Sequence, residues 1–163
     1  MIFAAIITVS DKGSQGKRQD LSGPAIAEML AGAGIEIKSS VIVPDEMDQI
    51  QKAIINFADI EKVDLILTTG GTGVSPRDVT PDATLKIIDK QIPGMAEVMR
   101  YESGKITPHA MISRAVAGIR GKCLIINLPG SPRGAKENLA AILPALKHAV
   151  AKIKGDDSEC ALP

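Results

Sequence analysis

The sequence has 163 residues, 45% of them hydrophobic, and its 19 basic side chains equal its 19 acidic ones. This composition excludes general disorder, and we expect a chain of this length to bury about 70% of the surface that it exposes when unfolded. A formal net charge of zero and an aromatic content of 2% argue against a nucleic-acid partner, which needs a basic surface or stacking rings. No apolar run reaches the roughly 18 residues that span a bilayer, so no membrane partner is expected.

The cysteines and the beginning of the sequence predict a cytoplasmic setting. Residues 1–4 lead directly into an apolar stretch, with no basic segment of the kind that opens a secretion signal. Cys123 lies in an apolar run, which is typical of a buried, inert thiol, and Cys160 lies in a polar tail. Their spacing is not that of a zinc site or a disulfide framework. His109 and His148 are expected at the surface, His109 beside a Thr-Pro loop that places it near a pocket.

The first half of the sequence alternates strands and helices. Continuous apolar character predicts a strand at residues 2–9, covered on both faces. Helical spacing of apolar side chains follows Pro24 and stops at Gly34, and it returns over residues 47–58. Strands are predicted at residues 35–43 and 63–69.

The second half continues the alternation with more breaks. We expect a helix from Pro81 to about residue 90, with Thr80 as its hydroxyl cap, and another at residues 95–102. Residues 112–119 are ambiguous but helical by spacing. A strand at residues 122–128 precedes a last helix that ends near residue 153, which Pro144 should kink or divide.

This order predicts an α/β fold, a three-layer sandwich with a mostly parallel sheet and helices on both faces. We expect one domain over residues 1–155 and a loose tail over residues 156–163. Ligands of such sheets bind outside the carboxyl ends of the strands. The loops that leave those ends are residues 10–11, 44–45, 70–78 and 129–132.

A glycine-rich run over residues 68–73 is the most informative of these loops. Three glycines in four residues, directly after a buried strand, let backbone N–H groups approach an anionic ligand closely. The run is not a Walker loop, because Val74 follows Gly73 where Lys is required, and it lacks the third glycine of the dinucleotide fingerprint. The motif alone leaves an ordinary strand-to-helix turn as an equal alternative.

Two acidic residues stand apart because they follow strand ends and precede helices. Asp45 has a second explanation as a helix cap, whereas Asp78 has none, and Asp82 fits a structural role in the first turn of a helix. If the two loops adjoin, Asp45 and Asp78 would hold Mg²⁺ against phosphate oxygens. The glycine loop has Arg77 as its sole cation, so a triphosphate there would need a metal ion.

Covalent catalysis has little support in the sequence. Ser10, Ser75 and Ser131 lie in loops, but none has a His nearby in the sequence. Positioning and charge stabilisation fit better, which favours phosphoryl or nucleotidyl transfer.

From Ile6 to about Ile153 the sequence resembles the molybdenum-cofactor biosynthesis proteins of the MoaB/Mog type and the equivalent domains of gephyrin and its plant counterpart. Each motif is weak alone, but their order and spacing together are specific. They are Val9-Ser10-Asp11, Asp20 with Ser22-Gly23, Pro44-Asp45-Glu46, Thr68 to Gly73, Arg77 to Thr84, Pro93-Gly94-Met95 with Glu97 and Arg100, Ser113-Arg114, and Leu128 to Pro132.

The resemblance implies a molybdopterin-binding domain that transfers AMP from MgATP to molybdopterin and releases pyrophosphate. It implies that Asp45 and Asp78 are the catalytic, magnesium-binding acids. It places the glycine loop against the nucleotide and phosphates, and the last of the four loops against the pterin. The implied nucleotide- and pterin-binding residues are Ser10, Asp11, Gly70, Gly71, Thr72, Gly73, Pro129, Gly130, Ser131 and Pro132.

The resemblance also implies a homo-oligomer, a trimer or hexamer, and it leaves two other functions open. The first is a non-catalytic molybdopterin-binding or carrier protein, because some compact members keep the motifs without a settled activity. The second is a molybdate-inserting enzyme, against which the short sequence argues, because those enzymes carry additional domains. Retention of both Asp45 and Asp78 favours the adenylyltransferase.

Overall fold

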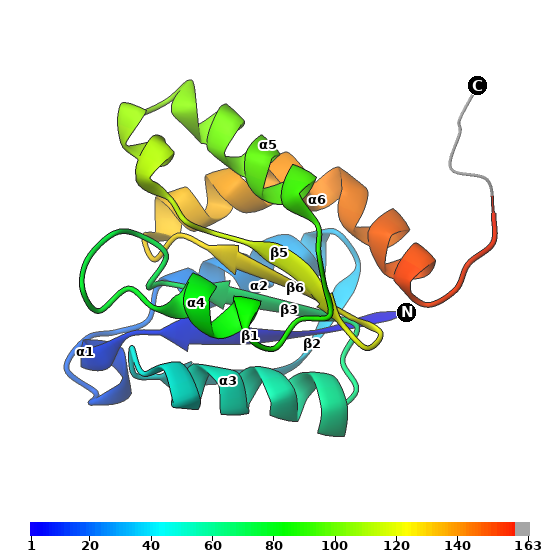
Figure 1. Ribbon diagram of the computed structural model, residues 1–163, viewed down its shortest axis with the longest axis horizontal. Coiled ribbons are helices and arrows are strands. Elements are labelled where there is room, and N and C mark those ends of the chain that lie inside the picture. Colours follow the sequence, from blue (N-terminus) through cyan, green and yellow to red (C-terminus); the bar gives the residue numbers. More distant parts are fainter. Residues whose placement is uncertain (159–163) are drawn as a thin grey trace.

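A computed structural model describes residues 1–158, and its six strands form one mixed sheet (Figure 1). The strand order is β2-β1-β3-β6-β5-β4, in which the first four strands are parallel and the last two pair antiparallel. The strands are β1 (Ile2–Val9), β2 (Ile35–Val43), β3 (Leu65–Thr69), β4 (Lys90–Gln91), β5 (Ala117–Arg120) and β6 (Cys123–Leu128).

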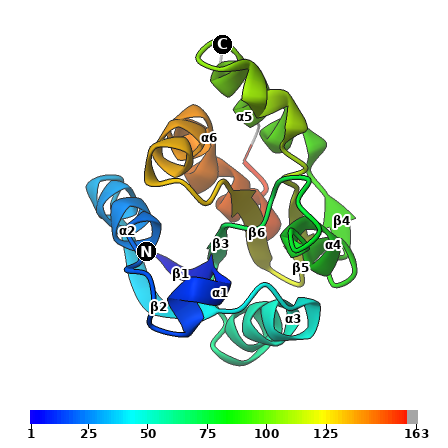
Figure 2. The ribbon, with the colours of Figure 1, turned by 90° about the vertical axis from the view of Figure 1, so that its left-hand side faces the viewer.

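Helices cover both faces of the sheet, which confirms the predicted α/β sandwich (Figures 1 and 2). Side chains of β1 alternate between two hydrophobic clusters, with Ala4 and Ile6 in one and Ala5 and Ile7 in the other. The first cluster contains residues of α2 (Ser22–Gly32), α5 (Pro93–Gly104) and α6 (Pro132–Ile153). The second contains residues of α3 (Met47–Ile55), the π-helical turn η1 (Asn56–Ile60) and α4 (Thr80–Leu85).

The prediction of a helix at residues 112–119 is wrong. A short 3₁₀ helix, η2 (Pro108–Ile112), is followed by β5, which forms a tight hairpin with β6. Gly121 lies in the connection with φ +56°, a conformation that suits glycine. Pairing with β6 buries Ala117 and Gly118, so sheet formation overrides the helical spacing of this short apolar run.

The region around α4 also differs from the prediction. The helix ends at Leu85, short of the expected residue 90, and the two-residue strand β4 follows. Thr80 is the first helical residue and not the cap, because the cap position is Val79. The Thr80 hydroxyl instead donates to the Gly70 carbonyl at 2.8 Å, which ties the helix to the end of β3.

Pro144 does not divide the last helix, which runs unbroken from Pro132 to Ile153. A proline lacks the N–H that would bond the carbonyl four residues earlier. That carbonyl belongs to Ala140, which is exposed, so water can satisfy it. The helix therefore tolerates the residue on its solvent side.

The first helices and the end of the chain differ in extent from the prediction. Helix α2 begins at Ser22, two residues before the expected Pro24, and the short helix α1 (Asp11–Ser14) was not expected. Residues 159–163, which hold Cys160 and most of the expected tail, lie outside the described part of the chain. Over residues 1–158, none of the helices combines the length and apolar character needed to cross a membrane.

Candidate nucleotide and pterin site

The four loops predicted to form a site meet at the carboxyl ends of the parallel strands, the edge that Figure 2 faces. They enclose a cavity of about 370 Å³, called here the Asp45 cavity. Its lining includes seven predicted site residues from these loops, namely Ser10, Asp45, Gly70, Gly71, Gly130, Ser131 and Pro132.

Asp45 links the loops after β1 and β2. Its carboxylate Oδ2 accepts the Asp11 N–H at 2.8 Å, while Asp11 Oδ1 accepts the Asp45 N–H at 3.0 Å. The cap position of α3 is Glu46, whose side chain makes no capping bond. The alternative of Asp45 as a helix cap is therefore wrong, since its carboxylate serves the neighbouring loop.

The two linked aspartates have opposite pKa shifts. Burial raises the pKa of Asp45 above its usual value of 3.8, and the negative charges of Asp11 and Asp78 raise this pKa further. The Arg77 guanidinium hydrogen-bonds Asp11 at 2.8 Å and lowers the pKa of that carboxyl. Arg77 also binds Glu46 at 2.8 Å, so the cation of the glycine loop is engaged by carboxylates.

The turn after β3 requires glycine at two positions. Gly70 has φ +106°, and a Cβ there would lie 2.2 Å from the Val9 carbonyl oxygen. Gly71 has φ +65°, and a Cβ there would lie 2.5 Å from Thr80 Oγ1 and 3.1 Å from Asp45 Oδ1. The Asp45 carboxylate therefore faces the backbone of the turn, with space only for a residue without a side chain.

Asp78 lies close to Gly73, two residues further along the same turn. Its Oδ2 accepts the Ser75 N–H at 2.9 Å and would lie 2.9 Å from a Cβ built on Gly73. The charge of Asp78 is near enough to contribute to the raised pKa of Asp45. The structure thus brings Asp45 close to Gly71 and Asp78 close to Gly73 of the same turn, although Asp78 is not among the residues that line the Asp45 cavity.

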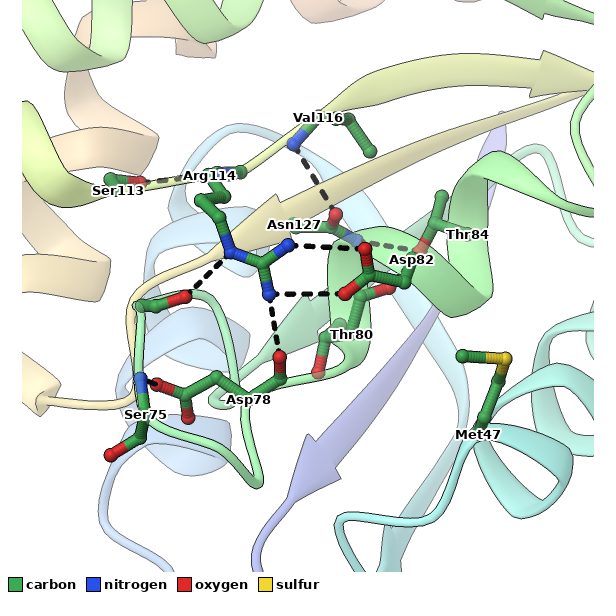
Figure 3. Close-up of polar contacts among 12 residues, drawn as sticks. Met47, Ser75, Asp78, Thr80, Asp82, Thr84, Ser113, Arg114, Val116 and Asn127 are labelled. Carbon is green, nitrogen blue, oxygen red and sulfur yellow. Dashed lines mark hydrogen bonds and ion pairs between the residues drawn. The ribbon is translucent and has the colours of Figure 1, made fainter.

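Arg114 closes the loop that carries Asp78 (Figure 3). Its guanidinium donates to the Gly73 carbonyl at 2.8 Å and to the Asp78 carbonyl at 2.6 Å. It also forms a two-bond ion pair with Asp82, at 3.0 and 3.1 Å, which lowers the pKa of Asp82. The predicted structural role of Asp82 therefore includes a partner that sequence reasoning missed.

A buried amide ties the sheet to α4 behind the turn. Asn127 on β6 donates to the Thr84 hydroxyl at 3.0 Å, and its Oδ1 accepts the Val116 N–H at 3.3 Å (Figure 3). It also donates to the Thr68 hydroxyl at 2.9 Å. The side chains of Asn127, Thr68 and Thr84 are buried, and unpaired polar groups are costly in the interior. Asn127 thereby joins β3, α4 and the segment before β5.

The loop after β6 lies against the glycine turn and begins α6. A Cβ on Gly130 would lie 3.1 Å from the Gly70 Cα, and the Thr69 hydroxyl donates to the Pro129 carbonyl at 2.7 Å. Ser131 caps α6 by accepting the Gly134 N–H at 3.1 Å. Ser10 likewise caps α1 through the Gly13 N–H at 3.0 Å.

A second cavity of about 260 Å³, called here the Arg100 cavity, lies on the other side of this loop. Ser131 lines both cavities, and Thr72 and Pro129 line the second. His109 is exposed and lines the Arg100 cavity, as expected. Asp11 and Gly73 line neither cavity; Asp11 orients Asp45, and the Gly73 carbonyl is bound by Arg114.

Sequence reasoning did not assign the segment of residues 18–22 to the site, although it lines the Asp45 cavity. Asp20 accepts bonds from the Thr8 hydroxyl at 2.7 Å and from the N–H groups of Ser22 and Gly23 at 3.1 and 3.0 Å. Asp20 lies just before Leu21, the cap position of α2, and its carboxylate binds the first two N–H groups of the helix and the end of β1. An acid two residues before Ser-Gly-Pro was the available signal for this contact.

The donor set of the site fits a hard divalent cation shared with phosphate. Within residues 1–158, no three His, Cys, Asp or Glu side chains gather as a metal-binding group. Asp45 and Asp78 supply carboxylate oxygens, and magnesium commonly takes only one or two from a protein. Of the described residues that line the Asp45 cavity, Arg18 is the only Lys or Arg, and the acids Asp20 and Asp45 line the same cavity. A polyphosphate would need added positive charge there.

Known proteins share most of this sequence. The family model described as a probable molybdopterin binding domain matches residues 5–148. Molybdopterin adenylyltransferase of Helicobacter pylori J99 is 45% identical over 158 residues, which cover 95% of this chain and 89% of that protein. The Escherichia coli K12 protein of the same name is 42% identical over 143 residues, covering 86% and 73%.

A solved structure shares the whole fold. The molybdopterin biosynthesis enzyme MoaB from Thermus thermophilus superposes with a TM-score of 0.91 at 52% identity, covering 95% of this chain and 98% of that one. The family model, the curated relatives and the shared fold point to the same family. The chain belongs to the MoaB/Mog family of molybdopterin-binding domains.

Proposed function

We propose that the protein is a molybdopterin adenylyltransferase, which transfers AMP from MgATP to molybdopterin and releases pyrophosphate. The observation that carries the proposal is that the Asp45 carboxylate lies close to Gly71 and the Asp78 carboxylate close to Gly73, near enough for the charge of Asp78 to act on Asp45. The names and identities of the relatives support the same activity.

In this proposal the nucleotide occupies the Asp45 cavity. The Gly70 N–H donates to the Leu128 carbonyl at 3.1 Å, so we assign phosphate binding to the N–H groups of residues 71–73. The pterin lies on the side of the loop of residues 129–132. Ser131, which lines both cavities, marks the place where the terminal phosphate of molybdopterin would meet the α-phosphate of ATP.

The reaction itself is a direct displacement. A terminal phosphate oxygen of molybdopterin forms a bond to the α-phosphorus, the bond from that phosphorus to the bridging oxygen breaks, and pyrophosphate leaves with the electron pair. Mg²⁺, when bound, neutralises charge on the transferred group and on the departing pyrophosphate. Asp45 and Asp78 would hold the cation, and Asp45 must be ionised to do so.

The serine side chains at the site support this displacement over a covalent intermediate on the protein. The hydroxyls of Ser10 and Ser131 accept backbone N–H bonds as helix caps. In this proposal the side chains of the site position the substrates and neutralise their charge.

The test is incubation of the purified protein with molybdopterin, Mg²⁺ and ATP, followed by detection of pyrophosphate and adenylylated pterin. Asp78→Ala should keep its affinity for molybdopterin and lose AMP transfer by about 100-fold or more. Asp48→Asn, which changes an exposed acid on α3, is the matched control and should behave as the parent. Pterin binding without AMP transfer by the unaltered protein would instead identify a non-catalytic carrier.

The same proposal includes a homo-oligomer, a trimer or hexamer, in the cytoplasm. Exposed apolar side chains on α5 and the segment after it support an interface between copies; they are Val98, Tyr101, Ile106, Met111 and Ile112. Light scattering of the purified protein measures the number of copies.

Burial raises the pKa of the Cys123 thiol to about 12, which suits a protein that keeps this cysteine reduced.

A further inference from the structure

We propose that Arg114 is a positioning residue for the adenylyl-transfer site: it fixes the loop of residues 72–78 and thereby the place of Asp78. The expected effect of Arg114 on the rate of AMP transfer rests on the proposed function. Its role in holding the loop does not. Arg114 lies 36 residues from Asp78 in the sequence, and the sheet brings them together.

The contacts of Arg114 close the loop at both ends. Its backbone N–H donates to the Thr72 carbonyl at 2.8 Å, and its Nε donates to the Gly73 carbonyl at 2.8 Å. Its Nη2 donates to the Asp78 carbonyl at 2.6 Å. One residue thus binds three main-chain oxygens, two at the start of the loop and one at its end.

The remaining guanidinium bonds hold Arg114 in place. Asp82 receives two of them, in the parallel geometry that a planar guanidinium and a carboxylate form best. Hydrogen bonding to Asp82 raises the pKa of Arg114, so the cation stays charged. Figure 3 shows the guanidinium between the Asp82 carboxylate and the loop carbonyls, while the Asp78 carboxylate points away toward Ser75.

This geometry separates positioning from catalysis. Arg114 lines neither the Asp45 cavity nor the Arg100 cavity among the residues described for them. It binds the carbonyl of Asp78, not its carboxylate, so it leaves the carboxylate available to a cation. Its effect on the reaction must therefore pass through the loop.

Loss of the guanidinium would remove the bonds to the Gly73 and Asp78 carbonyls together, while the backbone bond from residue 114 to the Thr72 carbonyl would remain. The interior of the loop is open to solvent: Gly73 is half-buried, and the four residues from Val74 to Arg77 are exposed. Little hydrophobic packing would therefore hold the loop in place of the lost bonds. A displacement of about 1 Å at a reacting or metal-binding group can lower a rate by about 100-fold.

Arg120, at the end of β5, supplies a matched control. It forms a two-bond ion pair with Asp59 and donates to the Ile87 carbonyl at 2.7 Å. Its side chain is 25% exposed, against 38% for Arg114. The two arginines thus have the same kinds of partners and similar exposure, but the partners described for Arg120 lie outside the glycine loop.

The first measurement does not need activity. Two amides in the loop report on its order: the Ser75 N–H donates to Asp78 Oδ2, and the Asp78 N–H donates to the Ser75 carbonyl. Hydrogen exchange of both amides should accelerate in Arg114→Ala and stay unchanged in Arg120→Ala. Unchanged exchange in Arg114→Ala would overturn the proposal. If Arg114→Ala fails to fold, Arg114→Lys gives the same comparison, because lysine keeps the charge but cannot bridge two carbonyls and Asp82.

The second measurement is the kinetics of AMP transfer. In Arg114→Ala and Arg114→Lys, kcat should fall by about 100-fold while the Kd for molybdopterin is unchanged, and in Arg120→Ala both should match the parent. Two results would overturn the proposal. A parental kcat in Arg114→Lys would show that only the charge of Arg114 matters. An equal loss of kcat in Arg120→Ala would show that the effect of Arg114→Ala comes from general stability. Absence of AMP transfer in the parent would end the proposed function alone, and the exchange data would still decide the role of Arg114.

Discussion

Asp11 and Asp45 each accept a hydrogen bond from the backbone N–H of the other, at 3.0 Å to Asp11 Oδ1 and 2.8 Å to Asp45 Oδ2. The exchange fixes the loops after two neighbouring strands relative to each other. It also holds two carboxylates close together, which the nearby Arg77 partly offsets.

Replacing Arg77 by glutamine should move the acidic limb of the pH–activity profile to higher pH. The charge of Arg77 lowers the pKa of Asp45, and its hydrogen bonds and charge lower that of Asp11. Without it, both carboxyls protonate at higher pH, and Asp45 holds a cation only when ionised. The profile of kcat/KM between about pH 4 and 8 measures this, with Lys52→Gln as a surface control. An unmoved limb would show that Asp45 does not govern activity.

Asp45→Asn should lower AMP transfer without lowering the stability of the fold. Because the folded-state pKa of Asp45 is raised above 3.8, the fold disfavours the ionised form, and stability falls as pH rises from about 3.8 through that raised pKa. At neutral pH the uncharged amide removes this cost while still accepting the Asp11 N–H. The variant should have an equal or higher Tm at neutral pH and lose about 100-fold or more in AMP transfer. A clearly lower Tm at neutral pH would contradict the sign of the shift.

Gly70→Ala should destabilise the protein by at least about 2 kcal/mol, because φ is +106° and the new Cβ would lie 2.2 Å from a backbone oxygen. Gly32→Ala is the control, since a Cβ at that helix position meets nothing within 4 Å. It should leave stability unchanged or raise it by about 0.5 kcal/mol. Urea unfolding of the two variants compares them directly, and equal stabilities would refute the constraint on the turn.

Asn127→Ala should cost about 3 kcal/mol, because it leaves two buried hydroxyls and a backbone N–H without their amide partner. Asn56→Ala, at an exposed position, should stay within about 0.5 kcal/mol of the parent. Chemical denaturation at neutral pH gives both values. A small effect at Asn127 would mean that water replaces the amide.

The sequence alone predicts the alternation of strands and helices, the sandwich and the strand ends where the cavities lie. These features follow from local patterns: buried strands read as continuous apolar runs, and Asp45 lies directly after one of them. That the loops carrying Asp45 and Asp78 meet also follows, because parallel strands end at the same edge.

The features that were missed depend on partners distant in the sequence. Nothing near Arg114 in the sequence indicates that it binds the loop of residues 72–78, and the short run at residues 117–120 becomes a strand only because β6 pairs with it. Asp20 similarly accepts an N–H group at the start of α2 and the hydroxyl of Thr8 on β1. Local spacing cannot predict such contacts, which arise from the packing of the whole sheet.

The Asp45 cavity is built from loops that leave β1, β2, β3 and β6, and the last of these loops lies at residues 129–132. During synthesis on the ribosome, the first three loops emerge well before the fourth. A nascent chain therefore has no complete binding surface until most of its length has been translated, and the lining of the Asp45 cavity is completed only when residues 129–132 have left the ribosome.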